Sequence, residues 1–261
     1  SVVVPVLDEQ SNLPACLASA GFAAAQLVVV DDRSRDRSAE LAALEDSLKR
    51  LERSNDVSVV IVSGRGRAFC AGNDIAEMPA LKPAEAKALS RRWQRIMDRF
   101  ARLPQVTIAA VHGYALGGGC MLAAAQDLRI ADTSARFGLP EVTLGFNPSY
   151  GIARLLDVMG GGPARDLLLT GRTIDAAEAL RMGLVTRVAP DGALDGAASE
   201  LAAAIARHPR GGLAATKAIV ADIRAGKSGD AAQAYAAALR RDKDARERIT
   251  AFIARRQGKK I

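Results

Sequence analysis

The sequence has few of the residues that mark several large classes of protein. Only 4% of its 261 residues are aromatic, so stacking surfaces for single-stranded nucleic acid are scarce. No apolar run approaches the roughly 20 residues that a membrane-spanning helix needs, and the apolar start at 1–7 lacks the basic lead-in of a signal peptide. The three cysteines, Cys16, Cys70 and Cys120, show no metal-ligand spacing. We therefore expect a cytoplasmic protein with no membrane partner and no metal.

The charge balance is basic but does not by itself select a partner. Lys and Arg number 36 against 29 Asp and Glu, which gives a formal net charge of +7. This excess could serve an anionic ligand, such as the phosphates of a cofactor or of nucleic acid, or could simply belong to a soluble surface. Because the arginines are scattered and aromatic residues are few, nucleic acid is the least favoured partner and we expect none.

Strand-like and helix-like segments alternate along the first 150 residues, which predicts an α/β fold with a mainly parallel sheet. Strand-like runs are found at 1–7, 27–32, 57–62, 106–113 and 127–132. Helix-compatible segments are found at 12–20, 38–53, 81–103 and 118–126. Residues 64–74 are expected to form a glycine-containing loop, and the chain is expected to be helical from Tyr150 onward. We expect one α/β core with a helical C-terminal extension of the kind that often builds an oligomer.

Two of the expected helices have clear apolar faces. In both, apolar residues recur at three- and four-residue spacing with charges on the opposite side. The first set is Leu41, Leu44, Leu48 and Leu51, and the second is Leu89, Trp93, Ile96, Met97 and Phe100.

Three consecutive glycines, Gly117, Gly118 and Gly119, lie where the 106–113 strand turns into a helix. Glycine permits unusual backbone angles and lets a ligand approach the main chain closely. The unpaired N–H groups at the start of a helix, together with the helix dipole, suit a developing oxyanion. The same glycines could instead serve only a tight, closely packed turn.

A second glycine-containing segment, 65–74, also follows a buried strand. It leaves that strand at the carboxyl end, which is where open α/β sheets bind ligands. Backbone N–H groups of Gly72 and Asn73 could converge with that of Gly118 on one carbonyl oxygen, and the arginines of the segment could bind phosphates.

Glu141 is an isolated carboxylate in the apolar stretch 136–146. Desolvation is expected to raise the pKa of its side chain, and a carboxyl group that titrates closer to neutrality can both take and return a proton. An isolated Glu is more often a surface or ion-paired residue, but the position after Phe-Gly-Leu-Pro favours a catalytic role.

Four motifs occur in order: FCAGND (69–74), HGYALGGGCMLA (112–123), DLRIAD (127–132) and FGLPEVTLGF (137–146). In this combination the chain resembles the crotonase (enoyl-CoA hydratase/isomerase) family over about residues 38–261. The resemblance implies a crotonase-like spiral of ββα units at 38–195 and a C-terminal helical region at 196–261 that builds a homotrimer or hexamer. It also implies an acyl-CoA thioester as the substrate, with coenzyme A as part of that substrate and no separate cofactor.

The resemblance also assigns roles to individual residues. Backbone N–H groups of Asn73 and Gly118 match the family's oxyanion hole, and Glu141 matches a catalytic glutamate. A thioester oxygen held between two donors stabilises an enolate, which serves hydration, isomerisation, decarboxylation or hydrolysis alike. The resemblance also implies a set of substrate-binding positions: Arg67, Ala71, Gly72, Asp74, Gly117, Met121, Phe252 and Arg255. Of these, Arg67 would lie beside the CoA phosphates. Phe252 and Arg255 would contact CoA from the C-terminal helix of a neighbouring subunit.

One departure from the family bears on the reaction. Hydratases of the family use two glutamates, and Met121 stands at the position of the first. Met121 lies one helical turn after Gly118 and should point the same way, but a thioether transfers no proton. Adding water requires a water activated between both carboxylates, whereas shifting a double bond requires one base. We therefore expect Δ3–Δ2 isomerisation or a related single-base reaction through Glu141, with Met121 lining the acyl pocket.

The start of the chain departs from the family as well. Residues 1–37 are expected to form an atypical βαβ-like segment, and up to residue 40 the sequence resembles the opening of a family 2 glycosyltransferase. In those enzymes the first βαβ unit cradles a nucleotide, and an acidic residue such as Asp8, Asp31 or Asp32 would contact its base or ribose. The second strand of the segment could equally serve the crotonase fold.

Four functions are therefore open, led by the single-base acyl-CoA enzyme. The alternatives are a true enoyl-CoA hydratase, a catalytically silent acyl-CoA-binding homologue and, remotely, a nucleotide-sugar glycosyltransferase. His112 and His208 have no partner spacing that indicates catalysis or a metal, so we expect them to be structural.

Overall fold

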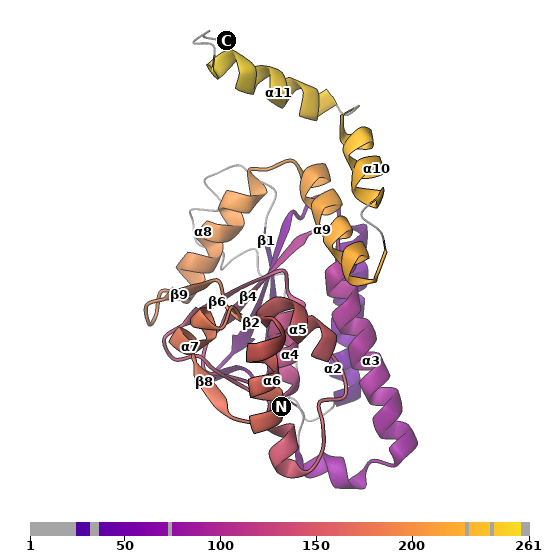
Figure 1. Cartoon of the computed structure of the whole chain (residues 1–261), viewed down its shortest axis with the longest axis vertical. Coiled ribbons are helices and arrows are strands. Elements are labelled where there is room, and N and C mark those ends of the chain that lie inside the picture. Colours follow the sequence, from indigo (N-terminus) through magenta and orange to yellow (C-terminus); the bar gives the residue numbers. More distant parts are fainter. Residues whose placement is uncertain (1–24, 32–36, 73–74, 228–229, 241–242, 257–261) are drawn as a thin grey trace.

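The computed structural model describes residues 25–31, 37–72, 75–227, 230–240 and 243–256, whose strands form two sheets (Figure 1). The larger sheet has five parallel strands in the order β1-β2-β4-β6-β9, as the alternating pattern predicts. Its strands are β1 (Ala25–Asp31), β2 (Val59–Arg65), β4 (Val106–Val111), β6 (Leu128–Asp132) and β9 (Arg187–Ala189).

The smaller sheet is built from short strands that follow those of the larger one. Its order is β3-β5-β7-β8, with β3, β5 and β7 parallel and β8 antiparallel to β7. Its strands are β3 (Ala68–Cys70), β5 (Tyr114–Leu116), β7 (Arg136–Gly138) and β8 (Thr173–Asp175). After β2, β4 and β6 the chain adds a strand to the smaller sheet and then proceeds to a helix, so it repeats a ββα unit.

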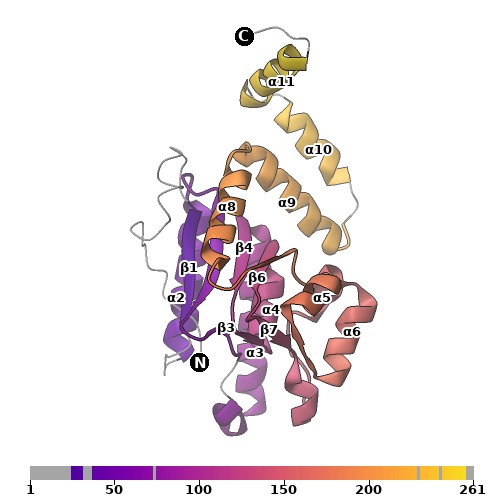
Figure 2. The same ribbon diagram turned by 90° about the vertical axis from the view of Figure 1, so that its left-hand side faces the viewer.

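The three central strands of the larger sheet, β2, β4 and β6, are buried on both faces over most of their length, as the apolar run at 57–62 predicts for β2. Val60 and Val62 of β2 belong to the main core, while Val59 and Ile61 belong to a second cluster. Helix α8 (Leu194–Ala206) contacts β2, β4 and β6 and covers this second cluster (Figure 2). Alternate side chains of a strand face opposite sides of a sheet, so helices on both sides are needed to exclude water.

Helices α2 (Arg37–Arg53) and α3 (Pro83–Arg102) confirm the two predicted amphipathic segments. Their buried residues are Leu41, Leu44, Leu48, Leu51, Trp93, Ile96, Met97 and Phe100, with Leu89 partly buried. Two ion pairs join the helices along their length: Arg92 Nε lies 2.9 Å from Glu45 Oε1, and Arg99 Nε lies 2.8 Å from Glu52 Oε1. Helix α3 is thereby fixed against α2 while its other side faces the candidate site.

The remaining helices of the core are short. They are η1 (Ile75–Ala80), α4 (Gly118–Ala125), η2 (Pro140–Leu144), α5 (Ile152–Met159), α6 (Gly161–Thr170) and α7 (Ala176–Arg181), where η marks a 3-10 helix. Helix α4 is buried along its whole length after its first residue. Its Gly and Ala residues explain this, because they let strands β3 and β5 of the smaller sheet and helices α3 and α5 approach its backbone closely.

The predicted C-terminal helical region, 196–261, begins within α8 and continues through α9 (Arg210–Arg224), α10 (Asp230–Leu239) and α11 (Lys243–Arg256). Figure 1 shows α10 and α11 projecting away from the two sheets. Large apolar side chains of α9, α10 and α11 stand exposed: Val220, Ile223, Tyr235, Ile249, Phe252 and Ile253. Among the described residues, no helix combines the length and the hydropathy that crossing a membrane requires.

Several sequence expectations need correction. The segment 64–74 is not entirely a loop, because β2 continues to Arg65 and β3 follows at Ala68–Cys70. The chain after Tyr150 is not purely helical either, since it contains β8 and β9. Strands β3, β8 and β9 have three residues each, too few for a periodic pattern to predict them from sequence. Their formation depends on tertiary burial, as for Phe69 in β3, which is 0% exposed.

The expected strand at 1–7 and helix at 12–20 lie outside the described residues. The expected strand at 27–32 is observed as β1, which pairs in parallel with β2 and leads toward α2.

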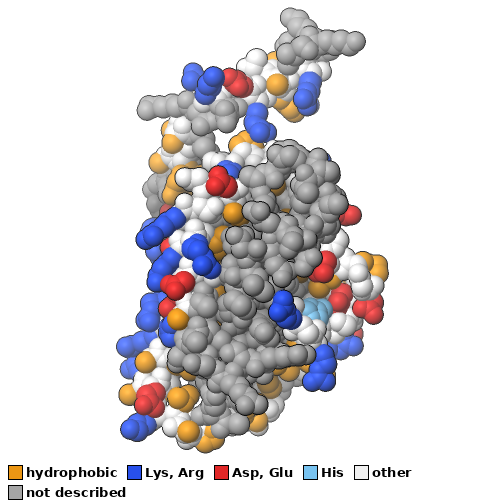
Figure 3. Space-filling model, turned by 180° about the vertical axis from the view of Figure 1, so that it is seen from behind, with side chains coloured by type: hydrophobic (Ala, Val, Ile, Leu, Met, Phe, Trp, Pro, Cys, Tyr) orange, Lys and Arg blue, Asp and Glu red, His pale blue; other side chains and the backbone are white. Residues whose placement is uncertain are grey.

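On the face seen in Figure 3, the described Lys and Arg side chains stand as separate groups with Asp and Glu among them.

Candidate active site

The glycine turn at the start of α4 is held tightly in place. Gly117 has φ +52° and donates its N–H to the carbonyl of Gly138 at 2.9 Å. A Cβ at Gly119 would stand 1.9 Å from the carbonyl oxygen of Cys70, so no larger residue fits there. The turn brings the first amide of α4, that of Gly118, to the end of the small sheet, and first-turn amides of a helix have no partner within the helix itself.

Gly72, just after β3, lies against this turn. A Cβ at Gly72 would stand 3.4 Å from the backbone nitrogen of Gly118 and 2.6 Å from the carbonyl oxygen of Leu116. The two glycine-containing segments are therefore neighbours in space, as expected for the carboxyl ends of adjacent parallel strands. Asn73 and Asp74 lie outside the described residues, so the orientation of the Asn73 amide stays a prediction.

Glu141 faces the same turn from the first turn of η2. Its Oε1 lies 3.0 Å from the point where a Cβ of residue 117 would stand. Its Oε2 is buried and has no hydrogen-bond partner among the described residues. Burial raises the pKa of this carboxyl above its ordinary value, and a hydrogen bond from the backbone of Glu141 opposes the shift only in part. The shift has the direction expected from the apolar sequence around Glu141, and its cause is the expected desolvation.

A cavity of about 390 Å³ joins these groups. Gly118, Met121, Glu141 and Tyr150 line it, and the exposed Lys87 is part of its wall. A smaller space of about 60 Å³ continues past Glu141. Its lining includes four more of the sequence-predicted residues or their neighbours: Ala71, Gly72, Gly117 and Pro140. The structure thus gathers most of the predicted site residues around these two spaces, the larger of which could hold part of a small-molecule ligand.

Met121, which the resemblance places at the position of a hydratase's first glutamate, lines the wall of the larger cavity. It is 2% exposed and follows Gly118 by one turn of α4. Its Sδ lies 2.9 Å from the point where a Cβ of residue 151 would stand, so Gly151 is pressed against its side chain. Glu141 is the only carboxylate among the described residues that line the two spaces.

Sequence analysis assigned no role to residues 149–151, yet Ser149 and Tyr150 line the larger cavity. Tyr150 is 8% exposed, lines the larger cavity and stacks on Trp93 with ring centroids 6.0 Å apart and planes 16° apart. Ser90 Oγ donates to the carbonyl of Ser149 at 2.8 Å, and the amide of Gly151 donates to Gln94 Oε1 at 3.1 Å. The one local signal was the turn-forming Asn-Pro-Ser-Tyr-Gly run that follows the Glu141 segment.

Three predicted substrate-binding residues lie apart from the cavity within this chain. Arg67 is exposed in the tight connection between β2 and β3. Phe252 and Arg255 lie on α11, which Figure 1 shows far from α4. Phe252 is 61% exposed, and the Cζ atom of Arg256 lies over its ring, 5.6 Å from the ring centroid. The contact of Phe252 and Arg255 with the CoA of a neighbouring subunit, and that of Arg67 with the CoA phosphates, stay predictions.

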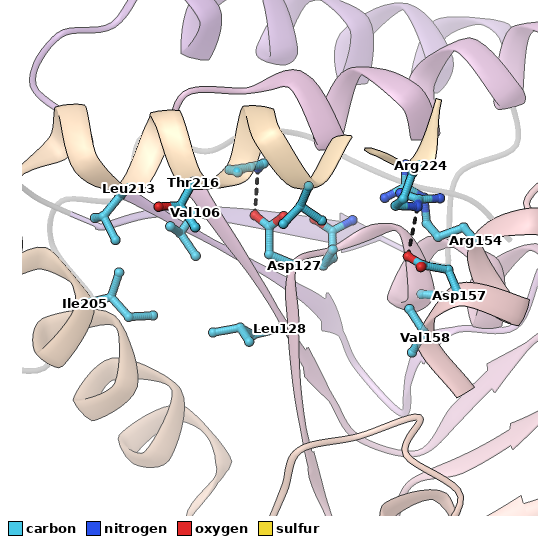
Figure 4. A pocket seen from close by; sticks show the side chains of 14 residues that line it. Val106, Asp127, Leu128, Arg154, Asp157, Val158, Ile205, Leu213, Thr216 and Arg224 are labelled. Carbon is cyan, nitrogen blue, oxygen red and sulfur yellow. Dashed lines mark ion pairs between the residues drawn. The ribbon is translucent and has the colours of Figure 1, made fainter. Parts of the chain in front are cut away.

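A second cavity, of about 400 Å³, lies between α8, α9 and the start of β6 (Figure 4). Four of its five charged side chains form two ion pairs: Lys217 Nζ lies 2.6 Å from Asp127 Oδ2, and Arg224 Nε lies 2.8 Å from Asp157 Oδ2. The fifth, Arg154, donates a hydrogen bond to the carbonyl of Ala125 at 3.2 Å. Lys217 also donates to the carbonyl of Gln105 at 2.7 Å. No sequence-predicted site residue lines this space. The two ion pairs fix α9 to the core. Because their charges are already paired, we assign them no role in binding a ligand.

In the part of the chain that the structure describes, no group of three or more His, Cys, Asp or Glu side chains is placed to hold a metal ion. His112 contacts the carbonyl of Gly66 at 3.1 Å through Nε2.

Comparison with known proteins defines the class. The family model described as enoyl-CoA hydratase/isomerase matches residues 38–259. The short-chain-enoyl-CoA hydratase of Clostridium acetobutylicum is 40% identical over 164 residues, 62% of this chain and 63% of that protein. A Mycobacterium bovis protein named "Probable enoyl-CoA hydratase echA8" is 47% identical over 141 residues, 54% of each chain. The chain thus matches less than two thirds of the length of these two relatives.

Comparison with a solved structure identifies the same family fold. The crystal structure of an enoyl-CoA hydratase from Bacillus anthracis superimposes with a TM-score of 0.79 and 30% identity, covering 91% of this chain and 95% of that one. This chain therefore belongs to the enoyl-CoA hydratase/isomerase family and has the crotonase-like α/β fold, which confirms the resemblance seen in its motifs. The family match begins at residue 38, and most of the segment that resembles a glycosyltransferase lies outside the described residues.

Proposed function

We propose that this chain moves a proton on an unsaturated acyl-CoA thioester, with Glu141 as its single base. The observation that carries the proposal is the buried, unpartnered Oε2 of Glu141 among the described residues, at the wall of a cavity that Gly118 also lines. A carboxyl whose pKa is raised by burial is suited both to accept a proton and to return it.

In this proposal, the amides of Gly118 and Asn73 hold the thioester oxygen. The close approach of Gly72 to the Gly118 nitrogen supports the idea, because it brings the end of β3 to the start of α4. A donor already fixed at a helix start, as the Gly118 amide is, needs little reorganisation as negative charge develops on oxygen.

The proposed reaction is a double-bond shift. Glu141 takes a proton from C2 of a Δ3-enoyl thioester, and the electron pair moves into a dienolate whose oxygen the two amides hold. The same carboxyl then returns the proton to C4, which leaves the double bond between C2 and C3. No atom is gained or lost, and Glu141 ends in its starting state.

Met121 favours isomerisation over hydration, because water addition generally needs a second proton-transferring group to hold the water. The names of the relatives support hydration as the main alternative. A silent acyl-CoA-binding homologue is the third candidate, since it would need the cavity but not a working base.

The test is to supply purified protein with a Δ3-enoyl-CoA and, separately, a Δ2-enoyl-CoA, and to follow thioester absorbance. Conversion of the Δ3 substrate without water addition is the expected result, whereas hydration of the Δ2 substrate would identify a hydratase. Binding of both without reaction would identify a silent homologue. Glu141→Gln should abolish turnover and retain CoA binding, with Glu200→Gln on the exposed side of α8 as the matched control.

We further propose that the C-terminal region 196–261 assembles the protein into a homotrimer or hexamer in the cytoplasm. The exposed apolar side chains of α9, α10 and α11 support this, because apolar surface of this kind is usually covered by a partner. In such an assembly Phe252 and Arg255 of one subunit would reach the CoA of the next. Light scattering of the purified chain should give three or six times the monomer mass; a monomer would contradict the proposal.

A further inference from the structure

The phenolic hydroxyl of Tyr150 lies directly over the start of α4. The oxygen stands 2.4 Å from the point where a Cβ of residue 118 would be, whereas the ring carbon that bears it stands 3.7 Å away. Only the hydroxyl end of the ring therefore reaches the Gly118 backbone, and a side chain at position 118 would displace it. Tyr150 and Gly118 line the same cavity as Glu141.

Helix α3 holds this hydroxyl in position through three consecutive contacts. Trp93 stacks on the Tyr150 ring. The peptide carbonyl before the tyrosine accepts a hydrogen bond from Ser90, and the amide after it donates one to Gln94. Ring and backbone are thus both fixed by one rigid element, which is the arrangement that preorganises a functional group.

The character of the hydroxyl fits the charge expected at this place. A phenol can donate one hydrogen bond and accept others without carrying a charge. Hydrogen bonds to a charged oxygen are roughly twice as strong as neutral ones. A donor beside the first amide of α4 therefore favours an enolate oxygen over the neutral thioester oxygen, which is what catalysis requires.

We propose that Tyr150 is a catalytic residue whose hydroxyl donates a third hydrogen bond to the thioester oxygen as the enolate forms. This inference rests on the proposed acyl-CoA function and adds a side-chain donor to the two backbone amides. With Met121 replacing a carboxylate, Tyr150 and Glu141 become the two side chains of the cavity that act on the substrate, one on its oxygen and one on its carbons.

The test compares Tyr150→Phe with wild type and with the matched control Tyr235→Phe, on α10. Two ligands are titrated: a saturated acyl-CoA, which has a neutral thioester, and a 3-ketoacyl-CoA, whose enolate absorbs in the near ultraviolet. We expect Tyr150→Phe to weaken enolate binding by about 10-fold or more and to leave the saturated ligand within about 2-fold. It should also lower kcat on a Δ3-enoyl-CoA by about 100-fold with little change in KM.

A tyrosine that only supports the loop would weaken both ligands equally, and that result would overturn the inference, as would unchanged binding and turnover. If wild-type protein binds the enolate selectively but turns over neither substrate, the proposed function fails while the Tyr150 comparison still decides the inference. If wild type binds neither ligand, both fail. Should Tyr150→Phe not fold, 3-fluorotyrosine at position 150 keeps the ring and makes the hydroxyl a stronger donor. It should then tighten enolate binding alone; no change would contradict the inference.

Discussion

The Oε1 atom of Glu141 lies 3.0 Å from the point where a Cβ of Gly117 would stand, so the carboxyl packs against the bare backbone of the glycine turn. Gly117 also has φ +52°. Gly117→Ala should therefore cost about 1–3 kcal/mol of unfolding free energy through backbone strain. It should also displace the carboxyl and lower kcat by about 100-fold.

The control for that change is Gly192→Ala. Gly192 has φ +74° but nothing within 4 Å of its Cβ position, so the strain is similar and the site is untouched. Thermal unfolding and steady-state kinetics of both variants separate the two effects. Equal activity loss in both would show that Gly117 matters only for stability.

The pKa of Glu141 predicts how stability depends on pH. Because burial raises this pKa in the folded state, the folded protein holds the proton more tightly than the unfolded chain does. The resulting stability is present below the unfolded pKa, about 4.3, and is lost as pH rises through the folded pKa. Glu141→Gln removes this loss.

Melting temperatures of wild type and Glu141→Gln between pH 4 and 8 check the sign. The difference should grow in favour of the Gln variant as pH rises from about 4 toward neutrality. Glu200→Gln, on an exposed position, should show no such trend. If the melting temperature of Glu141→Gln instead falls relative to that of wild type as pH rises, the Glu141 carboxylate is stabilised in the folded protein rather than destabilised by desolvation.

Met121→Glu should change the reaction. A carboxyl at position 121 would face the cavity that Glu141 lines, supply a second group able to hold water, and raise the pKa of Glu141 further by charge repulsion. The ratio of hydrated to isomerised product from a Δ2-enoyl-CoA should rise. Met121→Gln, which holds water but transfers no proton, is the control, and an equal rise in both would argue against proton transfer at position 121.

Much of this site could be predicted because its parts are local in sequence. The glycine turn, the lone Glu141 and the apolar faces of α2 and α3 each depend on residues within one element, where spacing is readable. Tyr150 could not be assigned, since Ser90 and Ser149 are 59 positions apart and no periodicity reports their contact. The strand β3 was missed for a related reason: only the tertiary burial of Phe69 identifies it.

The ion pair of Lys217 with Asp127 could not be predicted from the sequence either. Lys217 also contacts the carbonyl of Gln105, 112 positions away, and no local pattern reports such a contact.

Lys217 is 8% exposed, and burial lowers its pKa although Asp127 acts in the opposite direction. Lys217→Met leaves Asp127 and the Gln105 carbonyl without this partner and should cost about 2–4 kcal/mol. Urea unfolding measures the loss. The control Lys49→Met breaks an exposed pair with Asp46 and should leave the midpoint unchanged.

The most direct test of the account is a crystal structure of the protein with a saturated acyl-CoA bound. The account predicts that the thioester oxygen lies about 3 Å from the amide nitrogens of both Gly118 and Asn73, with Glu141 beside C2. A thioester oxygen remote from both amides, or an acyl chain seated between α8 and α9 instead, would contradict it.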